Sequence, residues 1–216
     1  WAIAVTVAIS TTAQVSGAHL NPAITLALAW IRDFSWTRVV PYWGAQLVGA
    51  ILASWCNFQL YASQLHAFET TQHLVRSTSL ATAKCFGEYY LAPVTTAQAF
   101  FAETLGTALL SGVIFALTHP DNTSNDDNKD SPNILIPSLI GLTVAGLICV
   151  LAPLTQCGLN PARDLGPRFV AYAAGWTSVA FSQAWLYIVA PLLGAPLGAW
   201  VVDHVLYRQV ITQQQE

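Results

Sequence analysis

The tetrapeptide Leu-Asn-Pro-Ala occurs twice in this chain, at residues 20–23 and 159–162. Each copy opens a short apolar stretch, 22–31 or 161–176, whereas a membrane-spanning helix needs about 20 apolar residues. Asn is a favoured N-cap and Pro is favoured in the first helical turn, so each copy predicts the start of a helix. Non-helical backbone at membrane depth is tolerated only inside protein or beside a watery cavity. We therefore predict two re-entrant half-helices.

The composition indicates a membrane protein. Hydrophobic residues make up 54% of the 216 residues and charged residues only 9%, whereas a soluble domain carries about 25% charged residues. The net charge is −3 and there is no basic stripe, so no nucleic-acid partner is predicted. The four cysteines have neither metal-ligand nor CxxC spacing, so we predict no metal site and no cofactor.

Five longer apolar stretches reach or nearly reach the length of a membrane helix. They are residues 1–15, 39–61, 97–117, 134–154 and 184–206. Three of them lie between the two tetrapeptides, so the second tetrapeptide must enter the membrane from the opposite face. This is the pattern of an inverted repeat with a shared site at the bilayer midplane. Two repeats of three spans require six, and we expect the missing span to precede Trp1.

We predict one channel domain over residues 1–216, truncated at its N-terminal side. Its parts are the end of the first repeat with its motif (1–61), a long extracellular loop (62–96), the second repeat (97–207) and a polar cytoplasmic tail (208–216). The cytoplasmic side is assigned from the arginines that follow the first half-helix and the last span, because cationic residues favour that face.

The two predicted turns have chemistry that suits a pore for uncharged molecules. A helix N-terminus carries roughly half a positive elementary charge, so two such ends meeting at the midplane repel cations, including hydronium. The Asn21 and Asn160 amides supply N–H donors to a passing oxygen. Arg163 follows the second motif directly, and an arginine inside a membrane is a functional candidate by default. We expect Arg163 to line the pore; the alternative is an arginine that merely caps the helix or pairs with Asp164.

Residues 15–23 and 158–168 resemble the major intrinsic protein family, the aquaporins and glycerol facilitators. The resemblance implies an all-α membrane protein, an inverted-repeat bundle of six transmembrane helices with two re-entrant half-helices. Five of the six are present here. The pore motifs it implies are Asn21-Pro22-Ala23 and Asn160-Pro161-Ala162. It also implies a homotetramer in a lipid bilayer, and we expect the plasma membrane to be its location.

The resemblance assigns the selectivity filter to Trp1, Ile148, Cys157 and Arg163. Trp1 stands where glycerol facilitators place an aromatic wall, and Arg163 stands where they place a hydroxyl donor. Ile148 stands where this branch usually has Gly, and Cys157 stands where bacterial members have an aromatic residue. The filter gains one large apolar group and loses one aromatic, so it stays amphipathic and its width is left open.

Other positions resemble the glycerol-conducting branch, in which an Asp follows the filter arginine. They are Asp164, Arg168, Pro191 and Leu192. The resemblance further implies two structural braces. His19 would support the first turn, and Glu103 would bind backbone N–H groups of the second half-helix loop.

The predicted function is a passive, aquaglyceroporin-like channel that conducts glycerol, water and other small neutral solutes and excludes protons and ions. The alternatives are a water-selective aquaporin and one that conducts urea or metalloid hydroxides. A secondary transporter is a weaker alternative, because it normally needs ion-coupling carboxylates at the midplane. We do not predict an enzyme, since the chain has no HExxH motif, no GxSxG motif and no paired Asp in its apolar runs.

Overall fold

The computed structural model describes residues 1–123 and 134–207. The described elements are α1 (Ala2–Ser16), α2 (Pro22–Ile31), α3 (Trp36–Thr71), α4 (Leu80–Ala83), α5 (Thr96–Leu117), α6 (Pro120–Thr123), α7 (Leu135–Thr155), α8 (Pro161–Ala173), α9 (Ala184–Val201) and a π-helical turn, η1 (Val202–Leu206). These residues contain no strand, so the all-α prediction is confirmed. The predicted tail, 208–216, lies outside the described residues.

Four of the described helices are long and apolar enough to cross a membrane: α3, α5, α7 and α9 together with η1. The ends of α5 and α7 lie within one residue of the predicted spans. The apolar helices α1 and α2 are shorter. The second half-helix, α8, ends at Ala173 rather than at the predicted residue 176.

The structure differs from the prediction at the long loop, because α3 continues to Thr71 and the loop begins at residue 72 instead of 62. Residues 62–71 contain no Gly or Pro that would stop a helix. The end of α3 is also held by the buried Glu69 carboxylate. It pairs with Arg76 at 2.6 Å and accepts a hydrogen bond from the Thr82 hydroxyl at 2.7 Å. Tertiary contacts therefore extend the helix beyond its apolar part.

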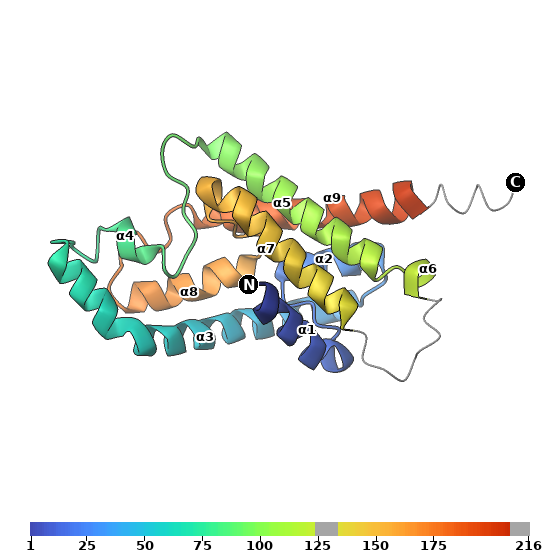
Figure 1. Ribbon diagram of the computed structural model, residues 1–216, viewed down its shortest axis with the longest axis horizontal. Coiled ribbons are helices and arrows are strands. Elements are labelled where there is room, and N and C mark those ends of the chain that lie inside the picture. The colour runs from blue at the N-terminus through green and yellow to red at the C-terminus, as the bar shows by residue number, and fades with distance from the viewer. Residues whose placement is uncertain (124–133, 208–216) are drawn as a thin grey trace, which may run out of the picture.

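The helix pairs follow the inverted repeat. Half-helix α8 packs against α3, the last helix of the first repeat, and half-helix α2 packs against α9, the last helix of the second repeat. The helices α1 and α7 pack against each other, and α5 lies along α9 (Figure 1). Each half-helix is thus held by a long helix of the other repeat, which brings the two motifs to the same level of the bundle.

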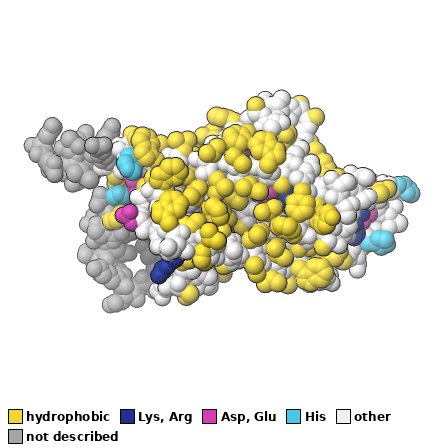
Figure 2. All heavy atoms as spheres, turned by 180° about the vertical axis from the view of Figure 1, so that it is seen from behind, with side chains coloured by type: hydrophobic (Ala, Val, Ile, Leu, Met, Phe, Trp, Pro, Cys, Tyr) yellow, Lys and Arg dark blue, Asp and Glu magenta, His cyan; other side chains and the backbone are white. Residues whose placement is uncertain are grey.

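The outer surface is largely apolar. Large hydrophobic side chains are strongly exposed on several helices, for example Ile3 (79%), Val40 (73%), Leu60 (71%) and Val150 (70%). Figure 2 shows hydrophobic side chains over the middle of one face, with most of the histidine and charged side chains toward its two ends. Such a surface suits a bilayer, in which exposed apolar side chains meet lipid and polar groups lie near the headgroups.

Among the described helices, α5 and α9 share the most extensive contact, and two glycines let them approach closely. A Cβ atom added at Gly198 would collide with the carbonyl oxygen of Ala108, and one added at Gly194 would collide with that of Thr104. Small residues of this kind let membrane helices approach closely and gain van der Waals contact.

We predict that Gly198→Ala destabilises the protein by about 1–3 kcal/mol, because the added methyl group forces two packed helices apart. Gly44→Ala is the matched control, since a Cβ atom there meets, beyond its chain neighbours and the adjoining backbone of α3, no described atom within 4 Å. Thermal unfolding of both variants in detergent measures the difference. Equal melting temperatures would contradict the predicted close packing.

Candidate pore and filter

Both motifs form helix caps of the same kind. The Asn21 and Asn160 backbones are extended, and each side-chain Oδ1 accepts a hydrogen bond from the start of its half-helix. Asn21 accepts from the Ala23 N–H at 2.8 Å. Asn160 accepts from the N–H groups of Ala162 at 3.0 Å and Arg163 at 3.2 Å. Each cap fixes its amide and starts the half-helix at that residue.

The two motifs also hold each other. The Asn21 Nδ2 donates to the carbonyl oxygen of Leu159 at 2.9 Å, and the Asn160 Nδ2 donates to the carbonyl oxygen of Leu20 at 2.8 Å. Both leucines adopt a φ of 53°, which turns the chain sharply just before each Asn. A carboxamide carries two N–H donors, so each Asn keeps one outside these bonds. These reciprocal bonds fix the two N-termini against each other.

Glu103 on α5 makes the contacts expected of a brace. Its carboxylate is fully buried and accepts from the backbone N–H groups of Gly158 at 2.9 Å and Leu159 at 2.8 Å. It also accepts from the Thr155 hydroxyl at 2.5 Å. The carboxylate thus satisfies the backbone of the turn before α8, which in lipid would otherwise have no partner.

His19 lies at the corresponding place before α2. Its Nδ1 is 3.1 Å from the Thr25 hydroxyl, and its ring packs against those of Phe34 and Tyr42 at centroid distances of 4.6 and 4.8 Å. Gln46 donates to the same Thr25 oxygen at 3.0 Å. His19 therefore has the contacts of a structural residue, although it also lines the cavity described next.

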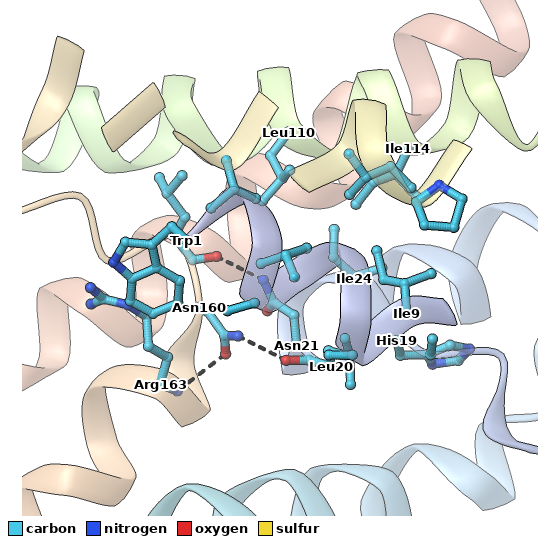
Figure 3. A pocket seen from close by; sticks show the side chains of 18 of the residues that line it. Trp1, Ile9, His19, Leu20, Asn21, Ile24, Leu110, Ile114, Asn160 and Arg163 are labelled. Atoms are coloured by element: carbon cyan, nitrogen blue, oxygen red, sulfur yellow. Dashed lines mark hydrogen bonds between the residues drawn. The ribbon is translucent and has the colours of Figure 1, made fainter. Parts of the chain in front are cut away.

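A cavity of about 860 Å³ runs along the two motifs. Its wall comes from α1, α2, α5, α7, α8 and the turns before both half-helices, and it is mainly apolar. Figure 3 shows Trp1 beside Arg163 at one end, Asn21 and Asn160 next to each other in the middle, and His19 toward the opposite end. The polar groups form one line along an otherwise apolar passage.

All four predicted filter residues belong to this wall. The Arg163 guanidinium carbon lies 4.7 Å from the centre of the Trp1 indole ring. Ile148 is half-buried. Cys157 is only 2% exposed and packs into an apolar cluster with Leu110 and its neighbours, so it offers little surface to the cavity.

The buried pair Asp164 and Arg168 lies behind the filter. Both are fully buried, and the Arg168 Nε donates to the Asp164 carboxylate at 2.8 Å. Arg168 also donates to the carbonyl oxygens of Ala180 and Ser182, each at 2.8 Å. The ion-pair partner of Asp164 is therefore Arg168 and not Arg163.

Pro191 and Leu192 lie apart from the cavity. Pro191 is buried within α9, and Leu192 packs against the apolar cluster that includes Ile24 and Ala27 of α2. The two residues therefore support the contact between the first half-helix and α9.

Sequence analysis missed Glu88, whose carboxylate forms an ion pair with the Arg163 guanidinium. Its only signal was an acidic residue between Gly87 and two tyrosines in a loop. That pattern does not separate a buried carboxylate from a solvated one.

We predict that Glu103→Ala strongly destabilises the protein, because it leaves a hydroxyl and two backbone N–H groups buried without an acceptor. Each unsatisfied group costs about 1–3 kcal/mol. Glu103→Gln keeps one acceptor oxygen, so its stability should lie between those of Glu103→Ala and the wild type. Melting temperatures in detergent test this order, and an Ala variant as stable as the Gln variant would contradict the role of a brace.

The sequence profile of the family described as major intrinsic protein matches residues 1–202. The chain is 40% identical to the glycerol uptake facilitator protein of Escherichia coli (strain K12) over 215 residues, which cover 98% of this chain and 74% of that protein. It is 38% identical to the propanediol uptake facilitator PduF of Salmonella typhimurium over 214 residues, 95% of this chain and 79% of that protein.

Among solved structures, the chain is similar to the aquaglyceroporin from Plasmodium falciparum. The TM-score is 0.82 at 26% sequence identity, over 98% of this chain and 82% of that chain. With the match of the family profile over nearly the whole length, these similarities establish that the chain belongs to the major intrinsic protein family.

Proposed function

We propose that this chain is a passive membrane channel that conducts glycerol and other small neutral solutes, together with water, and excludes ions and protons. The observation that carries the proposal is the single line of donors, from Arg163 to Asn160 and Asn21, along one apolar cavity. The names of the relatives, glycerol and propanediol uptake facilitators, favour the same class of solute.

The passage is suited to a polyol because it has two unlike sides. Hydroxyl oxygens accept hydrogen bonds from Arg163 and from the free N–H of each Asn, which replace the water that the solute loses. The carbon backbone meets apolar side chains such as Ile24, Leu110 and Ile148. Cations meet two helix N-termini and a guanidinium, all of positive potential.

We further propose that the two motifs, together with Trp1, Ile148, Cys157 and Arg163, form the pore and its filter, and that Glu103 and His19 support it. From membership of the family we also propose a homotetramer in a lipid bilayer, located in the plasma membrane, with the domain order set out from the sequence and the loop beginning at residue 72. The exposed apolar side chains of α3 support contact with lipid or with a second copy.

Stopped-flow light scattering on proteoliposomes of the full-length protein tests the function. We expect glycerol flux well above that of empty vesicles, rising linearly with the glycerol gradient. Saturating flux or accumulation of solute against a gradient would indicate a transporter. Water flux without glycerol flux would indicate the water-selective alternative.

We predict that Arg163→Ala keeps or raises glycerol flux but increases proton leak. The reason is the loss of a fixed positive charge from a passage of low dielectric, where charge acts strongly. Proton conductance under a pH gradient is the measurement. Arg38→Ala is the matched control, since Arg38 is exposed and does not line the cavity. An unchanged leak in a folded Arg163→Ala protein would contradict the filter role.

A further inference from the structure

Glu88 lies in the loop between α4 and α5. Its side chain is 8% exposed, and its Oε1 contacts the Arg163 Nη1. The guanidinium, whose own side chain is 22% exposed, thus lies near two groups: this carboxylate and, 4.7 Å from its central carbon, the Trp1 indole. Its position is therefore set by a residue outside the motifs.

The backbone of Glu88 is held on both sides by the buried Asp164–Arg168 pair. The Glu88 N–H donates to the Asp164 Oδ1 at 2.7 Å, and the Glu88 carbonyl oxygen accepts from the Arg168 Nη2. The other oxygen of Asp164 accepts from Arg168, so one ion pair satisfies both backbone groups. This arrangement is tight, since a Cβ atom at Gly87 would lie 2.8 Å from the Arg168 Cγ.

The neighbouring residue anchors the loop further. The Tyr89 hydroxyl donates to the carbonyl oxygen of Ala180 at 3.0 Å, and the Tyr89 N–H donates to the Gln156 side chain at 3.0 Å. Arg168 lies over the Tyr89 ring, 4.4 Å from its centre. Glu88 therefore sits on a loop fixed to α8, to the segment before α8 and to the segment before α9.

We propose that Glu88 is a specificity-determining residue of the channel, because it fixes the Arg163 guanidinium beside the passage, and that the Asp164–Arg168 pair is its positioning device. This inference rests on the proposed function. A guanidinium has five N–H donors, and the carboxylate decides which of them remain for a solute. Without it, a long charged side chain is free to move into the passage, and the larger solute is hindered more.

The carboxylate also lowers the net charge at the filter. A paired Arg163 presents less positive potential to a cation than a free one, so the two helix N-termini carry more of the barrier. We therefore expect Glu88 to act on the choice among neutral solutes more than on the exclusion of ions.

The ion pair gives a pH signature. Burial raises the pKa of the Glu88 carboxyl to about 7, while the Arg163 guanidinium opposes this rise. The groups that face or adjoin Glu88 are Arg163, Asp164 and Arg168 on α8, Glu103 on α5, Tyr187 on α9, Cys157 before α8 and the adjacent Tyr89. As external pH falls through about 7, the Glu88 carboxylate takes up a proton, and the negative charge beside Arg163 is lost.

The test is the ratio of glycerol to water permeability in proteoliposomes. We expect Glu88→Ala to lower the ratio by about two- to tenfold, the change that corresponds to one net hydrogen bond. Glu88→Gln, which keeps an acceptor oxygen, should lower the ratio less than Glu88→Ala does. The wild-type ratio should fall toward that of Glu88→Gln as external pH drops from 8 to about 6, and the ratio of Glu88→Gln should not change with pH. Lys84→Gln is the control for removing a charge from the same loop.

A double-mutant cycle tests the positioning device. If Asp164 acts through Glu88, Asp164→Asn lowers the ratio in the wild type but adds nothing to Glu88→Ala, because linked residues are not additive. Additive effects would overturn the positioning role. Should Glu88→Ala fail to fold, the glycerol-to-water ratio of Glu88→Gln at pH 8 decides, and a value equal to that of the wild type would overturn the role.

A folded Glu88→Ala protein with an unchanged ratio would overturn the role of Glu88 itself. Absence of glycerol flux from the wild type would instead contradict the proposed function. The two failures are therefore distinguishable.

Discussion

The reciprocal hydrogen bonds between the two motifs are the contact on which the rest of the structure depends. Two half-helices end inside a membrane protein, where unpaired backbone groups have no water to bind. The Asn21 and Asn160 side chains pair these groups in two ways. Each Oδ1 caps its own half-helix, and each Nδ2 donates to the carbonyl oxygen of the leucine that precedes the other Asn. The same atoms that close the fold leave one N–H of each amide at the cavity.

The buried charged side chains around this contact all have hydrogen-bond or ion-pair partners. Glu103 binds the turn before α8, and Asp164 and Arg168 bind each other and the Glu88 backbone. A charge buried without a partner would be strongly unfavourable, whereas these groups satisfy backbone atoms that need acceptors or donors. These buried charges thus hold the turn before α8 and the Glu88 backbone in place. Arg163, in contrast, belongs to the cavity wall.

The proposed filter consequently combines parts of different chemistry. In the proposal, Trp1 and the apolar wall supply contact area, Arg163 and the two Asn amides supply donors, and Glu88, which contacts Arg163, sets the geometry of the arginine. In the proposed channel, selectivity among neutral solutes and exclusion of cations depend on different parts. The helix N-termini act on charge over a distance, whereas a hydrogen-bond donor acts only on a solute that reaches it.

The sequence by itself determined the helices, the inverted repeat and the two turns, because apolar length and the Asn-Pro cap are local signals that a membrane leaves few ways to satisfy. It also predicted the backbone contacts of Glu103 through family resemblance. Only the tertiary structure decided that α3 continues to Thr71, that Cys157 is nearly covered and that Glu88 meets Arg163. These outcomes depend on contacts between segments distant in the chain, and no local pattern of residues encodes which loop carboxylate will be buried against which arginine.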